Sequence, residues 1–233
     1  MKTFSTKIFL LLLIFNLISC KKENSTSSIS EYKYAEQPQT INCANADSKL
    51  LNEALYTFEN DITSFYDAKQ KNAIRAYNGF IRQAASNKKP AFEEFASEHS
   101  VNIAKVLKET GVFNNDGLNY NHEIIKCIGE NMSAAGLETT FNALISTNSM
   151  SKELYKPALS GKASSMDKDK YLGLYVALEY FYAEVSKIDF SQIDFEKRDT
   201  ELSQKAKTVN PVSKIQSKSA TNPNVDFNKR PRK

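Results

Sequence analysis

The two histidines of this 233-residue chain are the residues whose type most directly suggests chemistry. His122 is followed by Glu123 and, four residues on, by Lys126. Two imidazoles four residues apart on one helical face can bind a zinc ion, but a cation occupies the second position here. His99 is the only other histidine, and no acidic cluster supports a carboxylate site. We therefore expect no metal site and no cofactor.

Residues 112–123 resemble part of an EF-hand calcium loop. If Gly117 is the sixth position, the third, fifth and twelfth positions are Asn114, Asp116 and Glu123. The first position is Val112, whose side chain has no oxygen to bind calcium. We therefore interpret the segment as a polar connector.

Residue combinations typical of catalysis are scarce. Glu94 and Glu98 share a predicted helix face and could act as an acid and base, although such pairs usually form a solvated face. A Cys127 nucleophile with His122 or His99 would lack an orienting group. The sequence has no phosphate loop, dinucleotide motif or nucleophile elbow. We predict no catalytic residue.

The first 24 residues carry the strongest motif. Lys2 and Lys7 precede an apolar run over residues 8–15, and Leu17, Ile18, Ser19 and Cys20 follow. This order resembles the signal peptide and lipobox of bacterial lipoproteins, and the run is too short to span a membrane. The resemblance implies a signal peptide over residues 1–19 and acylation of Cys20, with palmitate among the acyl chains. Several chains give a lasting membrane anchor.

The residues after Cys20 bear on which membrane holds the protein. Lys21, Lys22 and Glu23 resemble the charged stretch that sorts some lipoproteins to the outer membrane, and no Asp follows Cys20. We expect the outer membrane and leave its face open.

If Cys20 is acylated outside the cytoplasm, Cys43 and Cys127 remain as a pair. Two cysteines in an oxidising compartment favour a disulfide. The alternative is a Cys127 packed as a small apolar side chain and a loose Cys43.

Helical spacing of apolar residues dominates the body of the chain, so the predicted fold is all-α. We expect an irregular bundle of about five to seven helices with a central apolar C-terminal helix. The predicted helices cover residues 48–65, 73–84, 91–110, 122–132, 139–145, 151–159 and 168–187. Two alternatives stay open for residues 73–84, which either continue the first helix or follow a short break near residues 69–72.

The first helix shows one clear apolar stripe. Asp47 or Ser48 can cap it. Its inner face is predicted to hold Leu51, Leu55, Phe58, Ile62 and Phe65. The same spacing places Glu53, Glu59 and Asp61 on the outer, solvent-exposed face of this helix.

Charge and composition divide the chain into four parts. Residues 1–19 are the signal peptide, 20–43 a lipidated flexible tether, 44–190 the helical domain and 191–233 a polar, largely disordered tail. The end of the tail, residues 205–233, has eight basic residues and one acid, whereas residues 20–204 have 21 basic and 26 acidic residues. We expect the basic tail to contact anionic surfaces but not a specific nucleic acid.

The anchor and the poverty of catalytic residues predict a non-catalytic binding or scaffolding protein of the cell envelope with an unknown protein partner. Two alternatives stay open. One is a periplasmic enzyme whose carboxylates and tyrosines only the fold brings together. The other is an inhibitor or immunity-type lipoprotein that uses the acidic body.

Overall fold

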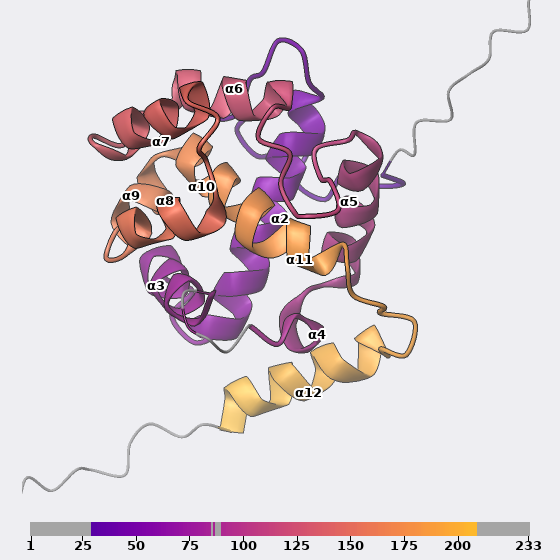
Figure 1. The fold of residues 1–233 in the computed structure, drawn as a ribbon. Coiled ribbons are helices and arrows are strands. Elements are labelled where there is room, and N and C mark those ends of the chain that lie inside the picture. The colour runs from indigo at the N-terminus through magenta and orange to yellow at the C-terminus, as the bar shows by residue number, and fades with distance from the viewer. Residues whose placement is uncertain (1–28, 85, 87–89, 209–233) are drawn as a thin grey trace, which may run out of the picture.

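The computed structural model describes residues 29–84, 86 and 90–208, and in these ranges the chain is all-α, as predicted (Figure 1). The described residues form no strand, and Phe113 and Leu118 make an isolated antiparallel bridge. No helix among them is long and apolar enough to cross a membrane. The elements in chain order are α2 (Ser48–Tyr66), α3 (Ala73–Ala84), α4 (Phe92–Phe95), α5 (Glu98–Glu109), α6 (Glu123–Asn131), α7 (Leu137–Ser146), α8 (Lys152–Leu159), α9 (Ala163–Lys168), α10 (Lys170–Val176), the π-helical segment η2 (Ala177–Tyr182), α11 (Ala183–Val185) and α12 (Phe195–Thr208).

Helix α2 is the long helix against which α3, α5 and α10 pack. It begins where its cap predicts, because the Asp47 carboxylate accepts the Leu50 N–H at 3.0 Å. It ends at Tyr66, and Lys71 in the following connection has a φ of 53°. Helix α3 therefore starts anew at Ala73 and does not continue α2.

Residues 170–185 form one helical run in which α10, η2 and α11 follow one another directly. Every residue from Leu172 to Ala183 is buried. Asp169 caps the run, since its Oδ1 accepts the N–H groups of Tyr171 and Leu172 at 3.1 Å each. Its Oδ2 accepts two further N–H groups just after α6, at 2.5 and 2.6 Å. One carboxylate thus joins the segment after α6 to the start of the run.

The helix predicted over residues 91–110 is in fact two helices. Ser97 interrupts it by capping α5, where its hydroxyl accepts the Ser100 N–H at 3.1 Å. The N–H of Ser97 itself donates to Asp61 on α2 at 2.8 Å. The expectation of five to seven helices is too low for the described residues, because short helices such as α4 and α9 show too few apolar positions for a period to be visible.

Chain segments on both sides of the predicted domain, residues 44–190, also pack. Ile29 and Ile41 are buried, although they fall in the predicted tether. Helix α12 occupies part of the predicted tail and lies below α4 in Figure 1. Its Phe195 ring stacks on Phe190 with centroids 6.2 Å apart. Such local apolar contacts offset the entropy of ordering, which composition alone did not reveal.

Several sequence-based predictions fall outside the described residues. These are the signal peptide, the acylated Cys20, the start of the tether up to residue 28, and tail residues 209–233.

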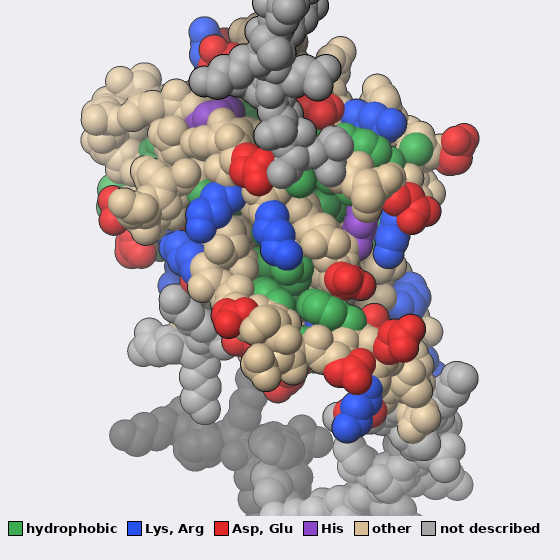
Figure 2. Space-filling model, turned by 90° about the vertical axis from the view of Figure 1, so that its right-hand side faces the viewer, with side chains coloured by type: hydrophobic (Ala, Val, Ile, Leu, Met, Phe, Trp, Pro, Cys, Tyr) green, Lys and Arg blue, Asp and Glu red, His purple; other side chains and the backbone are tan. Residues whose placement is uncertain are grey.

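The visible surface is of mixed charge. Figure 2 shows acidic and basic side chains interspersed on one face, with hydrophobic side chains in small groups between them. Across the described residues, Leu154 is the one large hydrophobic side chain that is largely exposed, at 60%. Scattered apolar side chains of this kind are normal for a solvated surface.

Candidate functional site

A cleft of about 670 Å³ lies between α8, the η2 and α11 segments and the loop that joins α5 to α6. This volume lies in the range of small-molecule sites. Its charged lining residues are Asp116, Glu153, Glu179 and Glu184 together with Lys152, Lys156 and Lys187, and its rings include Phe92, Tyr120 and Tyr180. The cleft is therefore polar, close to charge balance and bordered by aromatic rings.

Glu179 lies at the buried side of the cleft, inside η2, and is only 4% exposed. The Tyr120 hydroxyl donates to its Oε2 at 2.8 Å. Its Oε1 accepts no hydrogen bond from any described residue. In the described part, only Thr57 Oγ1 and Tyr175 Oη are fully enclosed without a partner, so Glu179 Oε1 has access to solvent. Glu179 is among the residues that line the cleft, and Oε1 is its carboxylate oxygen without a hydrogen bond.

Burial sets the electrostatics of this pair. It raises the pKa of the Glu179 carboxyl, while the Tyr120 hydrogen bond and the charge of Lys152 oppose the rise. Burial, followed by the charge of Glu179, also raises the pKa of Tyr120. The phenol therefore keeps its proton and acts as a donor. π-Helical turns such as η2 occur frequently at functional sites.

A second carboxylate and tyrosine in the cleft surround a lysine. The Lys152 ammonium lies 3.0 Å from Glu184 Oε1 and 5.0 Å from the centroid of the Tyr180 ring. The Tyr180 hydroxyl donates to the Lys152 carbonyl oxygen at 3.3 Å. This arrangement combines an ion pair with a cation–π contact.

The prediction that Glu53, Glu59 and Asp61 lie on the solvent-exposed face of α2 is wrong. Glu53 is 2% exposed, and its Oε1 lies 2.6 Å from His99 Nε2 on α5. Its two oxygens also accept the N–H groups of Lys33 and Tyr34 at 2.7 and 3.0 Å. The segment before α2 and helix α5 thus cover the face that helical spacing assigns to solvent.

Glu59 and Asp61 have their own partners. The side chain of Glu59 is 15% exposed, and its Oε1 lies 2.8 Å from the Lys170 ammonium. Asp61 is 4% exposed, and its Oδ2 accepts hydrogen bonds from the Ser97 N–H at 2.8 Å and the Ser100 hydroxyl at 2.7 Å. Burial raises the pKa of Asp61 to about 6, although these hydrogen bonds favour the charged form. These interior carboxylates do not line the cleft beside Glu179.

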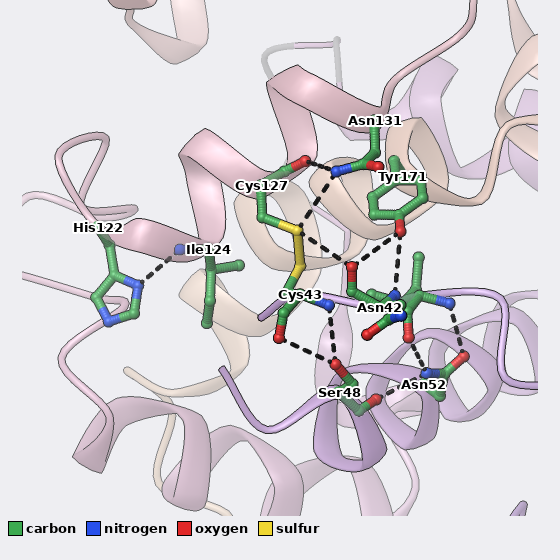
Figure 3. Close-up of a disulfide and its surroundings, with 10 residues drawn as sticks. Asn42, Cys43, Ser48, Asn52, His122, Ile124, Cys127, Asn131 and Tyr171 are labelled. Atoms are coloured by element: carbon green, nitrogen blue, oxygen red, sulfur yellow. Dashed lines mark hydrogen bonds between the residues drawn. A yellow bond between two sulfur atoms is a disulfide. The ribbon is translucent and has the colours of Figure 1, made fainter. Parts of the chain in front are cut away.

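Cys43 and Cys127 form a disulfide with Cα atoms 5.8 Å apart, which links the segment before α2 to α6 (Figure 3). The neighbouring backbone is fixed by polar side chains. The Cys43 N–H donates to Ser48 Oγ at 2.9 Å, and the Asn42 N–H donates to Tyr171 Oη at 3.0 Å. Cys127 therefore has no free thiol to act with a histidine.

The remaining sequence candidates have structural roles. His122 caps α6, where its Nδ1 accepts the Ile124 N–H at 3.2 Å (Figure 3), and its Nε2 lies 3.1 Å from the Thr110 carbonyl oxygen. Lys126 is exposed and lies near Glu130. No group of three or more His, Cys, Asp or Glu within the described ranges is placed to hold a metal ion.

The partial EF-hand segment is a turn. Asn114 Oδ1 accepts the N–H groups of Asp116 and Gly117, at 3.0 Å each, so it bonds its own loop. Val112 is fully buried. Glu94 and Glu98 are exposed and belong to different helices.

The cleft residues Tyr120, Lys152 and Glu179 did not emerge from the sequence. They come from three elements, and Tyr120 and Glu179 lie 59 residues apart in the chain. One signal was available, because Glu179 is the lone acid in an otherwise apolar stretch from Leu172 to Ala183. A charged residue in a buried helix is rare unless it has a partner or a function.

The fold and the cleft define an all-α protein with one internal disulfide and a buried carboxylate at a polar cleft. Comparison with known protein families, with curated proteins and with solved structures finds no match.

Proposed function

We propose that this chain is a lipid-anchored binding protein of the bacterial cell envelope, held at the outer membrane through Cys20, and that the cleft beside Glu179 is its binding site. The observation that carries the proposal is the buried Glu179 carboxylate in the lining of the cleft, with one oxygen bonded by Tyr120 and the other without a hydrogen bond from any described residue. A carboxylate that is buried without full hydrogen bonding is costly to stability, and such groups cluster at functional sites.

The anchor part of the proposal rests on the sequence. Basic residues, an apolar run and Ser19 precede Cys20 in the order that a lipobox requires. The charged residues 21–23 favour sorting to the outer membrane. Acylation would concentrate the binding site at the membrane surface.

We further propose that the helical run from 170 to 185 is the central element of an irregular bundle. Its burial from Leu172 to Ala183 and its packing against α2, α6 and α9 support this. A central element would fix the position of Glu179, because a site built on a packed helix is held more tightly than one built on a loop.

The test is a nuclear magnetic resonance titration of the folded protein with small amines, carboxylates, sugars and nucleobases. We expect at least one class to shift the backbone signals of Tyr120, Lys152 and Ala183. Signals of Asn45 and Lys126, which line a separate hollow beside the disulfide, serve as the internal control and should not move. If no class shifts the cleft signals, or if every shift lies elsewhere, the proposed binding site is wrong.

The Tyr120 and Glu179 pair favours a second candidate, a periplasmic enzyme. A buried carboxylate with a raised pKa can act as a general base or acid. The other cleft carboxylates fit this role less well, because Glu153 and Asp116 are exposed and Glu184 pairs with Lys152. If the titration ligands are chemically changed by the wild-type protein but not by the Glu179→Gln variant, the enzyme replaces the binding protein.

A further inference from the structure

The cleft holds two pairs of a carboxylate and a tyrosine, and only one of the pairs contacts a lysine. Glu184 and Tyr180 hold the Lys152 ammonium between them. Glu179 and Tyr120 have no lysine or arginine partner within hydrogen-bond or ion-pair distance among the described residues. In this cleft, therefore, one pair of a carboxylate and a tyrosine already binds an ammonium group, and the Glu179 and Tyr120 pair has no such partner.

From this geometry, and resting on the proposed function, we infer that the cleft binds a small ligand through a protonated amine or guanidinium group, whose N–H donates to Glu179 Oε1. The Tyr120 hydroxyl fixes the carboxylate by bonding Oε2 at 2.8 Å, so Oε1 is held ready to accept. Hydrogen bonds between charged partners are shorter and stronger than those between neutral ones.

Chemistry argues for a cation over a neutral or anionic group. Only 4% of Glu179 remains exposed. Water therefore cannot fully hydrate its ionised carboxylate. A cationic N–H donor both hydrogen-bonds the buried carboxylate and balances its negative charge, whereas a hydroxyl group supplies only the hydrogen bond. An anion would be repelled by the carboxylate. The volume of about 670 Å³ suits a small molecule.

Lys156 and Lys187 on the same lining refine the ligand class. They weaken the attraction for a bare cation and supply donors for an anionic group. A ligand that carries a guanidinium or ammonium together with a carboxylate would satisfy both sides of the cleft. Arginine is therefore a suitable probe, with methylguanidinium as the probe for the cationic group alone.

The experiment measures the dissociation constants of arginine, methylguanidinium and tetramethylammonium for the wild-type protein and for two variants of equal charge change. Glu179→Gln removes the proposed acceptor, and Glu153→Gln removes an exposed carboxylate from the same cleft. We expect Glu179→Gln to weaken arginine and methylguanidinium binding about tenfold or more. Glu153→Gln should weaken it less than about threefold, because an exposed charge contributes little. Tetramethylammonium, which has no N–H, should bind at least about tenfold more weakly than methylguanidinium.

Several outcomes overturn the inference. Equal losses of affinity in the two variants would show a general effect of charge and not a contact with Glu179. If tetramethylammonium bound as tightly as methylguanidinium, the proposed N–H hydrogen bond would be wrong. If only sugars or anions bound in the cleft, the inferred cationic ligand would be wrong, but the proposed binding function would stand. Absence of any cleft ligand would overturn both. If Glu179→Gln does not fold, the wild-type titration decides, because methylguanidinium must shift the signals of Tyr120 and Glu179 most strongly.

Discussion

Asp61 links residue chemistry to pH. Burial is the largest influence and raises the pKa of its carboxyl from 3.8 to about 6, against hydrogen bonds from Ser97 and Ser100 and the charge of Arg198. Because the folded pKa lies above the unfolded one, the native state binds more protons between these two pH values. The contribution of Asp61 to stability is fully present below the unfolded pKa of 3.8, is lost as the pH rises through the folded pKa of about 6, and stays constant above about pH 7.

The variant Asp61→Asn tests this directly, since it cannot ionise and keeps one oxygen for Ser97 and Ser100. Urea unfolding of wild type and variant at pH 4, 5, 6 and 7 gives the difference in their free energies of unfolding. We expect that difference to move in favour of the variant by about 2 kcal/mol between pH 4 and 6 and to level off above about pH 7, out of about 3 kcal/mol for the whole transition at about 1.4 kcal/mol per unit of pKa shift. A difference that does not change with pH would contradict the raised pKa.

Residue spacing predicted the apolar face of α2 but not the burial of its acidic side chains. A period of 3.6 residues shows which side of a helix must be buried. It does not show whether distant segments cover the other side. Glu53 is covered by His99, 46 positions away, and by the backbone before α2. Such contacts depend on tertiary arrangement, so the sequence alone could not place these carboxylates.

At the scale of elements, the disulfide fastens the segment before α2 to α6 across 84 positions. A double variant, Cys43→Ser with Cys127→Ser, should lower the free energy of unfolding by about 2 to 4 kcal/mol, because the unfolded chain gains freedom. Urea unfolding measures this. Reduced wild type is the control and should match the variant. If oxidised wild type is no more stable than the variant, the link does not stabilise the fold.

Helix α12 is joined to the segment around α4 through Arg198. Arg198 donates to the carbonyl oxygens of Ala96 at 2.7 Å and Glu93 at 3.3 Å. We expect Arg198→Ala to make the backbone amides of α12 exchange at least about tenfold faster in hydrogen-exchange mass spectrometry, since lost hydrogen bonds to a charged donor typically cost 1.5 to 3 kcal/mol.

The neighbouring Lys197 provides the matched control for that measurement. Its side chain is exposed, so Lys197→Ala should leave the exchange rates of α12 nearly unchanged. Equal effects of the two substitutions would show that helix propensity, and not the contact of Arg198 with α4, holds α12.

For the whole molecule, the all-α class and the start of α2 followed from the sequence because each depends on local spacing or a cap. The cleft did not, because three elements bring together Tyr120, Lys152 and Glu179. Residues 29–43 and helix α12 were misjudged for a related reason. Their composition is polar, but a few apolar residues, such as Ile41 and Phe195, find partners that only the folded body supplies.

Attachment through Cys20 underlies the proposed role of the whole protein. The most direct measurement is the intact mass of the chain extracted from the membranes of bacteria that make it, with Cys20→Ala as control. We predict a chain that begins at Cys20 and carries the mass of its acyl groups, and a variant that lacks them. A wild-type chain with an unmodified Cys20, or one that keeps residues 1–19, would contradict the anchor.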